Sequence, residues 1–471
     1  MKTIQLTSIT LCVLLSACKP VGPDYQGPPK VGHAAKFRGG GSRPVSLDKW
    51  WRKLGSSELN RLVDQALENN HDIAIAGQRI REARALRKQA ASAILPRADA
   101  STSYTHTSLS SMPGLDSFGT MAGAGFLDSS LKYWSAGIDV SWEIDVFGGG
   151  KRKIRGAKAR EQAAQEALHA TRLAIAAEVT ETYFTIAGMR EQLAKVNAQV
   201  KLQQSQTNDT KQRLAAGASS RLDFDRARAR LAMIQANIPP LEAGIVTQLR
   251  RLSLLLGIQP GALDGRRVAA RSLPASLPMV RTGLPADLIL RRPDVRIAER
   301  ELAAATEDIG VAVSSFYPRF SIGGGPANVS SSSGNLFNPS DFFWQYSPQV
   351  RWSPFTAGSN KAALEAANAR QKAAMLRYQK SSLAAIGEVE SSLANLHSET
   401  RKLAIVQRAR AATASAVKRI QSNYEAGATD RIDVLVEEER LREVEITEIR
   451  VKSQMMQLWI RLHKSLGGGW N

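Results

Sequence analysis

The chain contains the same segment twice, and this duplication limits its possible folds more than any other feature. Asp72–Arg97 aligns without a gap on Asp294–Arg319, at an offset of 222 residues. Ala216–Asp223 matches Ala426–Asp433 at an offset of 210. Because each copy of a repeat should adopt the same supersecondary structure, the copies are interpreted together. The difference in offset indicates a longer insertion in the first copy, before Trp142, where a surface loop tolerates added length.

Each copy is predicted to run helix, strand, loop, strand and then two very long helices. No proline interrupts residues 151–216, and apolar residues recur there every seven positions, at Val179, Ile186, Leu193, Val200 and Leu214. This spacing is typical of a coiled-coil seam. The second copy keeps the seam, although Arg410 interrupts it. At about 1.5 Å per residue, a segment of this length makes on the order of 100 Å of helix, which a compact domain does not need.

The two strand candidates with the clearest pattern are residues 134–143 and 344–352. In each of them apolar side chains take one face and polar side chains take the other. Two hairpins per chain cannot close a barrel, and an open sheet edge in lipid leaves backbone groups unpaired at a large energetic cost. We therefore expect three chains with four strands each to close a twelve-stranded barrel. A soluble sandwich is the alternative, which the neighbouring long helices disfavour.

The N-terminus predicts a lipoprotein. Lys2 precedes an apolar run too short to span a bilayer, so residues 1–17 are interpreted as a signal peptide. Small residues lead to Cys18 as lipoprotein signal peptidase requires, which predicts a covalent lipid on Cys18 and no other cofactor. Cys12 would be removed with the signal peptide, so disulfides and thiol catalysis are excluded. Lys19 stands where an aspartate would favour the inner membrane, which predicts sorting to the outer membrane.

Composition argues against several other functions. The formal net charge is +20, but lysine and arginine are spread along the chain, and export removes most of the case for a nucleic-acid partner. A basic duct lining that favours anions stays open. The six histidines are dispersed without metal-ligand spacing and are expected at the surface, so no metal site is predicted. The glycines at 148–150 lack the pattern of a phosphate-binding loop and are expected to turn a strand into a helix.

Several short motifs follow one another along the chain: Val21–Tyr25, Trp50-Trp51, Ile238–Glu242, Leu284–Leu288, Arg291–Val295 and Leu466–Trp470. In this order they resemble the TolC-like outer-membrane efflux proteins, in the lipoprotein branch called NodT-type. The resemblance implies a mainly α homotrimer in which a twelve-stranded outer-membrane β-barrel continues into a coiled-coil barrel of long helices. It also implies a belt of shorter helices that holds residues 45–57, residues 258–285 and the C-terminus.

The resemblance further implies an outer-membrane channel of a tripartite efflux system, extending into the periplasm. Such a channel conducts small molecules that an inner-membrane transporter and a periplasmic adaptor hand over. It is anchored to outer-membrane lipid and is not an enzyme. The chain is then divided into a signal peptide (1–17), a first efflux repeat (18–260) and a second repeat with an equatorial C-terminal tail (261–471). A lipid-anchored coiled-coil scaffold without a pore and an enzyme acting on envelope polymers are the alternatives, and the exported substrate stays open.

The repeated glycine turns are the predicted contact points for the adaptor, because they are matching ends of long helices. The residues assigned to this contact are Gly217, Arg221, Asp223, Gly427, Asp430, Arg431 and Asp433. The family resemblance implies that the periplasmic end is closed by an apolar ring and an acidic ring. By position these rings fall on Ile432, Val436 and Glu437, with the acidic ring displaced because valine stands where similar proteins often hold aspartate.

Overall fold

The computed structural model divides into two compact units, each of which takes residues from both sequence copies. The sheet unit comprises Met1–Pro28, Arg81–Gln162 and Arg300–Leu376, and the hairpin unit comprises Pro29–Ile80, Ala163–Glu299 and Arg377–Asn471. The structure describes residues 19–32, 37, 48–108, 130–264, 268, 272–274, 276–278, 280 and 282–468. The insertion expected before Trp142 and the lipidation site Cys18 lie outside these residues.

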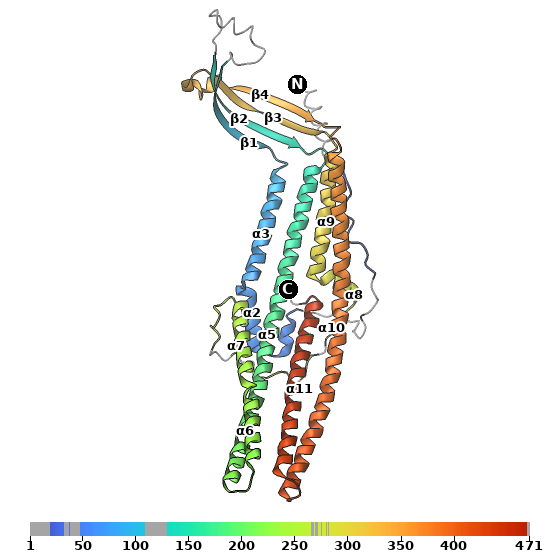
Figure 1. Ribbon diagram of the computed structural model, residues 1–471. Helices are drawn as coiled ribbons and strands as arrows, with labels where there is room; N and C mark the ends of the chain where they lie inside the picture. The colour runs from blue at the N-terminus through green and yellow to red at the C-terminus, as the bar shows by residue number, and fades with distance from the viewer. Residues whose placement is uncertain are drawn as a thin grey trace, which may run out of the picture. The chain divides into compact units, whose positions relative to one another are not determined.

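The sheet unit carries one antiparallel sheet with the strand order β1-β2-β3-β4 (Figure 1). The strands are β1 (Arg97–Ser108), β2 (Ser130–Ile144), β3 (Arg319–Ser330) and β4 (Phe343–Arg351). The alternation predicted for β2 agrees with the structure, since Ser135 pairs with Ser103 of β1 through their hydroxyls at 2.8 Å while the Ile138 and Trp142 side chains are exposed on the other face. In β4 every residue is exposed in the single chain, so the alternation predicted there stays a prediction. The strands β1 and β4 form the outer edges of the sheet.

The helices repeat as the sequence offsets predict. The helix α3 (His71–Ser92) corresponds to α9 (Pro293–Ser314), and α5 (Gly149–Ala215) corresponds to α10 (Ser359–Glu425), each of these last two being 67 residues long. The predicted fold class, mainly α with four strands per chain, is confirmed. Among the described helices, none combines the length and the apolar character needed to cross a membrane.

The expectation of two very long helices per copy is wrong for the second helix of each pair. In the second copy this helix is α11 (Arg431–Ser465), with 35 residues, and in the first copy it is divided into α6 (Arg221–Gln235) and α7 (Ile238–Leu255). The division precedes Pro239 and Pro240. Because proline lacks the backbone N–H of a helix interior, both prolines lie in the first turn of α7.

Two short elements in the hairpin unit, η1 (Trp50–Leu54) and α2 (Ser57–Asn69), pack around a tryptophan cluster. The short helix α8 (Pro285–Arg291) belongs to a separate apolar cluster through Leu288. Trp50 is fully buried with its ring centroid 5.6 Å from that of Trp459, and the Trp459 indole donates to the carbonyl oxygen of Pro278 at 2.9 Å. Residues 50, 278 and 459 come from the three segments that the expected belt was to hold.

His463 corrects the expectation that the histidines lie at the surface. Its ring packs against both indoles, with its centroid 5.1 Å from that of Trp50 and 3.8 Å from that of Trp459, and only 3% of the residue is exposed. The spacing of one helical turn places His463 on the same apolar face as Trp459. Burial lowers the pKa of His463 to about 4, so the imidazole is neutral at neutral pH.

The interruption of the helical seam at Arg410 also has a physical cause. In the hairpin unit the Arg410 guanidinium bonds the Glu448 carboxylate of α11 at 3.3 Å, and Lys452 bonds the same carboxylate at 2.8 Å. Burial of Glu448 acts to raise the pKa of this carboxyl, but the bond and charge of Lys452 and the charge of Arg410 outweigh it and lower the pKa. An apolar residue at 410 would leave this buried carboxylate with one cation fewer.

Candidate functional site

The two repeated turns have the same backbone. Gly217 follows α5 with a φ of +75°, and Gly427 follows α10 with a φ of +74°. The next amide bonds a carbonyl five residues earlier, from Ala218 to Arg213 at 2.7 Å in the first copy and over the equivalent residues at 2.8 Å in the second. This is the Schellman ending of a helix, which favours glycine because the left-handed conformation strains other residues.

The first turn is stabilised by a capping box. The Ser220 hydroxyl accepts a hydrogen bond from the Asp223 backbone N–H at 3.1 Å, and the Asp223 carboxylate accepts one from the Ser220 backbone N–H at 3.3 Å. The carboxylate also accepts a bond from the Ser220 hydroxyl at 2.6 Å. The bond from the Ser220 side chain is the largest cause that lowers the pKa of Asp223. Arg221 pairs with Asp225 at 3.1 Å. The Asp223 carboxylate is therefore engaged in the helix cap, and the nearby Arg221 guanidinium pairs with Asp225.

The second turn differs in its side chains. Asp430 occupies the N-cap position of α11, and its carbonyl oxygen accepts a hydrogen bond from the Asp433 N–H at 3.2 Å. The Arg431 guanidinium lies 5.4 Å from the centroid of the Tyr424 ring, within the range of a cation–π contact. The two turns thus share a backbone shape but present different chemistry.

The two turns line one cavity in the hairpin unit, with a volume of 520 Å³. The hairpins α5–α6 and α10–α11 that form it lie side by side (Figure 1). Four predicted site residues lie along it: Asp223, Asp430, Arg431 and Ile432. Its other lining residues are mostly polar, so the cavity offers hydrogen-bonding groups of both charges.

The predicted constriction residues lie along the first turns of α11. In the single chain Ile432 is 60% exposed and Val436 is 42% exposed. Glu437 bonds Arg440 of the same helix at 2.8 Å. Val436 and Glu437 do not contribute to the cavity between the turns, so the structure brings Ile432 to the adaptor-turn residues and leaves the other two apart.

Polar contacts tie the two hairpins together beyond the turns. Gln206 of α5 donates to Glu438 at 3.4 Å, and Lys195 of α5 bonds Glu445 at 3.2 Å. Arg230 of α6 pairs with Glu439. The carboxylates at 438 and 439, which follow the position predicted for an acidic ring, therefore have partners within the chain.

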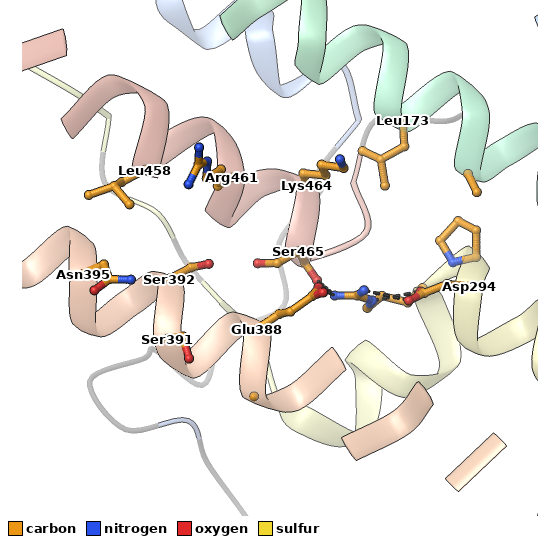
Figure 2. Close-up of a pocket in the computed structure, with 14 residues that line it drawn as sticks. Leu173, Asp294, Glu388, Ser391, Ser392, Asn395, Leu458, Arg461, Lys464 and Ser465 are labelled. Atoms are coloured by element: carbon orange, nitrogen blue, oxygen red, sulfur yellow. Dashed lines mark hydrogen bonds and ion pairs between the residues drawn. The ribbon is translucent and has the colours of Figure 1, made fainter. Parts of the chain in front are cut away.

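A second cavity in the hairpin unit has a volume of 710 Å³ and is lined in part by Arg292. Figure 2 shows the lining residues Asp294, Glu388 and Ser465 close together. The Arg292 guanidinium donates to Glu388 at 2.7 Å, to the Asp294 carboxylate at 2.7 and 2.9 Å and to the carbonyl oxygen of Ser465 at 2.9 Å. Burial acts to lower the pKa of Arg292, but the bonds and charges of Asp294 and Glu388 outweigh it and raise the pKa. Arg292 thus holds the end of α11 against the start of α9.

Sequence reasoning noted Arg292 only as part of a family motif and missed its role. The repeat offsets could have found it, because Asn70 precedes Arg292 by 222 residues and Leu255 precedes Ser465 by 210. The Asn70 amide donates to the carbonyl oxygen of Leu255 at 3.0 Å. Both copies therefore bind the end of their last helix with the side chain that precedes α3 or α9.

Within the described residues no group of three or more His, Cys, Asp or Glu side chains could hold a metal ion. The sheet unit thus holds a four-stranded sheet with two open edges, and the hairpin unit holds duplicated helical hairpins with matched turns. This is the fold of an outer-membrane efflux channel.

The chain belongs to the family described as outer membrane efflux protein, whose model matches residues 62–258 and 284–468. Nodulation protein T of Rhizobium leguminosarum bv. trifolii is 28% identical over 479 residues, which cover 100% of this chain and 98% of that protein. Cation efflux system protein CusC of Escherichia coli O6:H1 is 27% identical over 493 residues, which cover 100% of both. The solved outer-membrane channel OprN matches with a TM-score of 0.85 and 29% identity, covering 96% of this chain and 99% of that one.

Members of this family are trimeric outer-membrane channels of tripartite efflux pumps. The protein is therefore an outer-membrane channel of such a system and extends into the periplasm. This membership favours the channel over a scaffold without a pore, and it places the chain in a family of channels and not of enzymes.

Proposed function

We propose that the protein works as a homotrimeric exit duct, anchored by lipid at Cys18, that receives small molecules from an inner-membrane transporter through a periplasmic adaptor. The observation that carries the trimer is the open sheet. The strands β1 and β4 have 12 and 9 residues, and each has one side without a partner strand in the described chain. Trp344 and Tyr346 of β4 are 80% and 84% exposed. Edges of this length require partner strands in lipid, and three copies supply twelve.

Mass measurement of the detergent-solubilised protein tests the trimer, provided that the bound detergent is subtracted. We expect the mass of three chains. A well-folded monomer that carries a closed barrel would refute this architecture.

The two glycine turns are proposed as the adaptor contact. The cavity between them supports this, because it exposes Asp223, Asp430 and Arg431 at the ends of the hairpins, where a partner can reach both charges. Reversing the charge of Arg221 and Arg431 together should abolish efflux and crosslinking to the adaptor while trimer assembly is unchanged. The matched control is Arg401→Glu, an exposed cation on α10. A double variant that pumps and crosslinks like the wild type would move the docking site elsewhere.

The closed end is proposed to be narrowed by Ile432, Val436 and Glu437 from three chains. This proposal is supported by the exposure of the Ile432 and Val436 side chains, which lie at the start of α11 close to the Gly427 turn. Ile432→Ser should raise the single-channel conductance of the closed protein. Leu222→Ser is the control, because Leu222 occupies the equivalent position of the first copy and is 57% exposed. Equal conductance in the two variants would rule out a ring at Ile432.

The lipid anchor at Cys18 is proposed from the small residues before it and from the outer-membrane location of the family. Cys18→Ser should lose labelled palmitate and keep an uncut or misprocessed signal peptide, because the acylated thiol is the substrate of the next step. Palmitate that persisted in the variant would sink the lipoprotein assignment.

The duct itself is proposed to perform no catalysis and to leave the choice of cargo to the transporter and adaptor. The name cation efflux system protein refers to the relative CusC and does not identify the cargo of this chain. Reconstitution with different transporters tests the idea, because the exported compound should follow the transporter. A cargo that followed the duct would overturn it.

A further inference from the structure

One arginine in the sheet unit is completely buried beside the first residues that follow Cys18. Arg152, in the first turn of α5, has 0% of its side chain exposed. Its Nη1 donates to the Glu307 carboxylate of α9 at 3.0 Å. The remaining donors face Pro20–Asp24, which we call the post-cysteine segment. The residue pattern does not indicate this burial, because Arg152 stands between two lysines in a run of three cations. Both neighbours, Lys151 and Lys153, are exposed.

Arg152 binds the post-cysteine segment mainly through its backbone. Its Nε donates to the carbonyl oxygen of Val21 at 3.1 Å, and its Nη2 donates to those of Pro20 at 3.2 Å and Gly22 at 2.9 Å. Nη2 also lies 2.9 Å from the Asp24 carboxylate. A guanidinium presents a rigid fork of donors and no acceptor, so it can collect several oxygens at once. The segment therefore replaces the water that a buried guanidinium loses.

The post-cysteine segment fits its site closely. Gly148 has a φ of +76°, and a Cβ built on it would lie 2.5 Å from the Cβ of Pro20. Gly22 has a φ of +87°, and a Cβ there would lie 2.6 Å from the Cα of Gly310. A side chain at either position would push the segment away from its site. The segment is therefore docked, and does not merely pass over the surface.

The duplication provides an internal control for this site. At the same offsets that align the helices, the counterpart of Arg152 is Ala362 and the counterpart of Glu307 is Ala85. The strand-to-helix turn of the second copy thus has alanine in place of Arg152, and α3, which corresponds to α9, has alanine in place of Glu307. Because a buried charge is costly unless it is well bonded, the fold alone does not account for an arginine here. The post-cysteine segment accounts for the buried arginine, since it supplies four of the oxygen atoms that surround the Arg152 guanidinium.

We propose that Arg152 is the positioning residue for the lipid anchor: it holds Pro20–Asp24 at the junction of β2 and α5, and it thereby limits how far from that junction a lipid on Cys18 can enter the membrane. This inference rests on the proposed lipidation of Cys18. Cys18 precedes Pro20 by two residues, and Pro20 contacts Gly148 between the end of β2 and the start of α5. The lipid then holds the strand ends at the membrane surface while the chains assemble.

Hydrogen exchange on the purified full-length trimer tests the docking. The Val21 N–H donates to the carbonyl oxygen of Phe147 at 3.0 Å, so its exchange reports whether the segment is bound. In Arg152→Gln this amide should exchange about tenfold faster or more, whereas Lys153→Gln should match the wild type. Arg152→Lys, which keeps the charge but loses the fork, should be intermediate. In cells, Arg152→Gln should also reduce the outer-membrane trimer severalfold without changing palmitate incorporation.

A second variant serves if Arg152→Gln does not fold. Gly22→Val should exclude the segment while the pair between Arg152 and Glu307 stays intact, and it should speed exchange at Val21 in the same way. Unchanged exchange in Gly22→Val and in any folded Arg152→Gln would overturn the proposal. Loss of palmitate from Arg152→Gln alone would also overturn it, because the residue would then act on acylation. Wild-type protein without palmitate would instead refute the anchor at Cys18, and the exchange result would still report the docking.

Discussion

The indole Nε1 of Trp142 donates a 2.9 Å hydrogen bond to the carbonyl oxygen of Ile94, which joins the end of β2 to the residues that follow α3. The second copy repeats this bond from Trp352 to Phe316 at 3.1 Å. Ile94 and Phe316 each lie two residues past the last residue of a helix, so their carbonyl oxygens have no partner within that helix. In both copies a tryptophan supplies that partner, from within β2 in the first copy and from the residue after β4 in the second.

Replacing these tryptophans with phenylalanine should therefore cost stability even though the ring is kept. Trp142→Phe and Trp352→Phe should each destabilise the trimer by about 1 kcal/mol, the net value of one hydrogen bond. Thermal unfolding in detergent measures the effect. Trp344→Phe, at a residue that is 80% exposed, is the control and should change the midpoint least. Equal shifts in all three variants would argue against a role for the bonds.

The repeated turns should respond to alanine according to their backbone conformation. A Cβ at Gly217 or Gly427 would meet no atom within 4 Å, so only the left-handed φ opposes it. Each substitution should cost about 1 kcal/mol and speed exchange of the Ala218 or Ala428 amide about fivefold. Gly77→Ala, in the interior of α3 with equally open space, should be neutral or stabilising. A stabilising effect at Gly217 would contradict this account.

The buried imidazole of His463 should make stability depend on pH. Its pKa is lowered from 6.5 to about 4 by burial. Between pH 4 and pH 6.5 the imidazole is therefore protonated in the unfolded chain and neutral in the folded chain. Stability is full above about pH 6.5, declines as the pH falls and has lost about 3 kcal/mol below pH 4. His463→Phe should remove this decline, whereas His71→Phe, at an exposed residue, should keep it. Unfolding midpoints measured across pH 4 to 7 decide the matter.

Restoring the interrupted seam should destabilise the protein. Arg410→Leu completes the apolar spacing but removes a cation from the buried Glu448, at an expected cost of about 1 to 2 kcal/mol at neutral pH. Because the folded state lowers the pKa of Glu448, this contribution is present above the unfolded pKa and is lost as the pH falls through the lowered value. The variant should therefore approach the wild type in acid. Arg408→Leu is the exposed control, and a more stable Arg410→Leu would refute the argument.

The order of the helices and strands could be predicted because the duplicated sequence contains the same pattern twice. The long helices begin at Gly149 and Ser359 and end at Ala215 and Glu425, with both bounds 210 residues apart. Periodic apolar spacing and two agreeing copies are local information, which a single sequence contains. The division before Pro239 was missed, although proline favours the first turn of a helix over its middle.

The long-range polar contacts could not be predicted in the same way. Arg152 stands in a run of three cations, and its partners Val21 and Glu307 are more than a hundred residues away in either direction. The burial of His463 was missed for a similar reason, since one of the rings packed against it, that of Trp50, comes from the other end of the chain. Spacing reveals which face is apolar, but it does not reveal which charge that face will enclose.

The exposed outer strands of the sheet have a consequence for how fast the channel must be built. A chain that has not yet met its two partners carries unpaired backbone along β1 and β4 and bare aromatic rings at Trp344 and Tyr346. Unpaired strand edges of this kind can also pair in a wrong register or with a wrong partner. The yield of channel then depends on whether each chain reaches the bilayer before it collides with another chain in the aqueous compartment. Higher expression without faster delivery to the bilayer should therefore produce aggregate and not more channel.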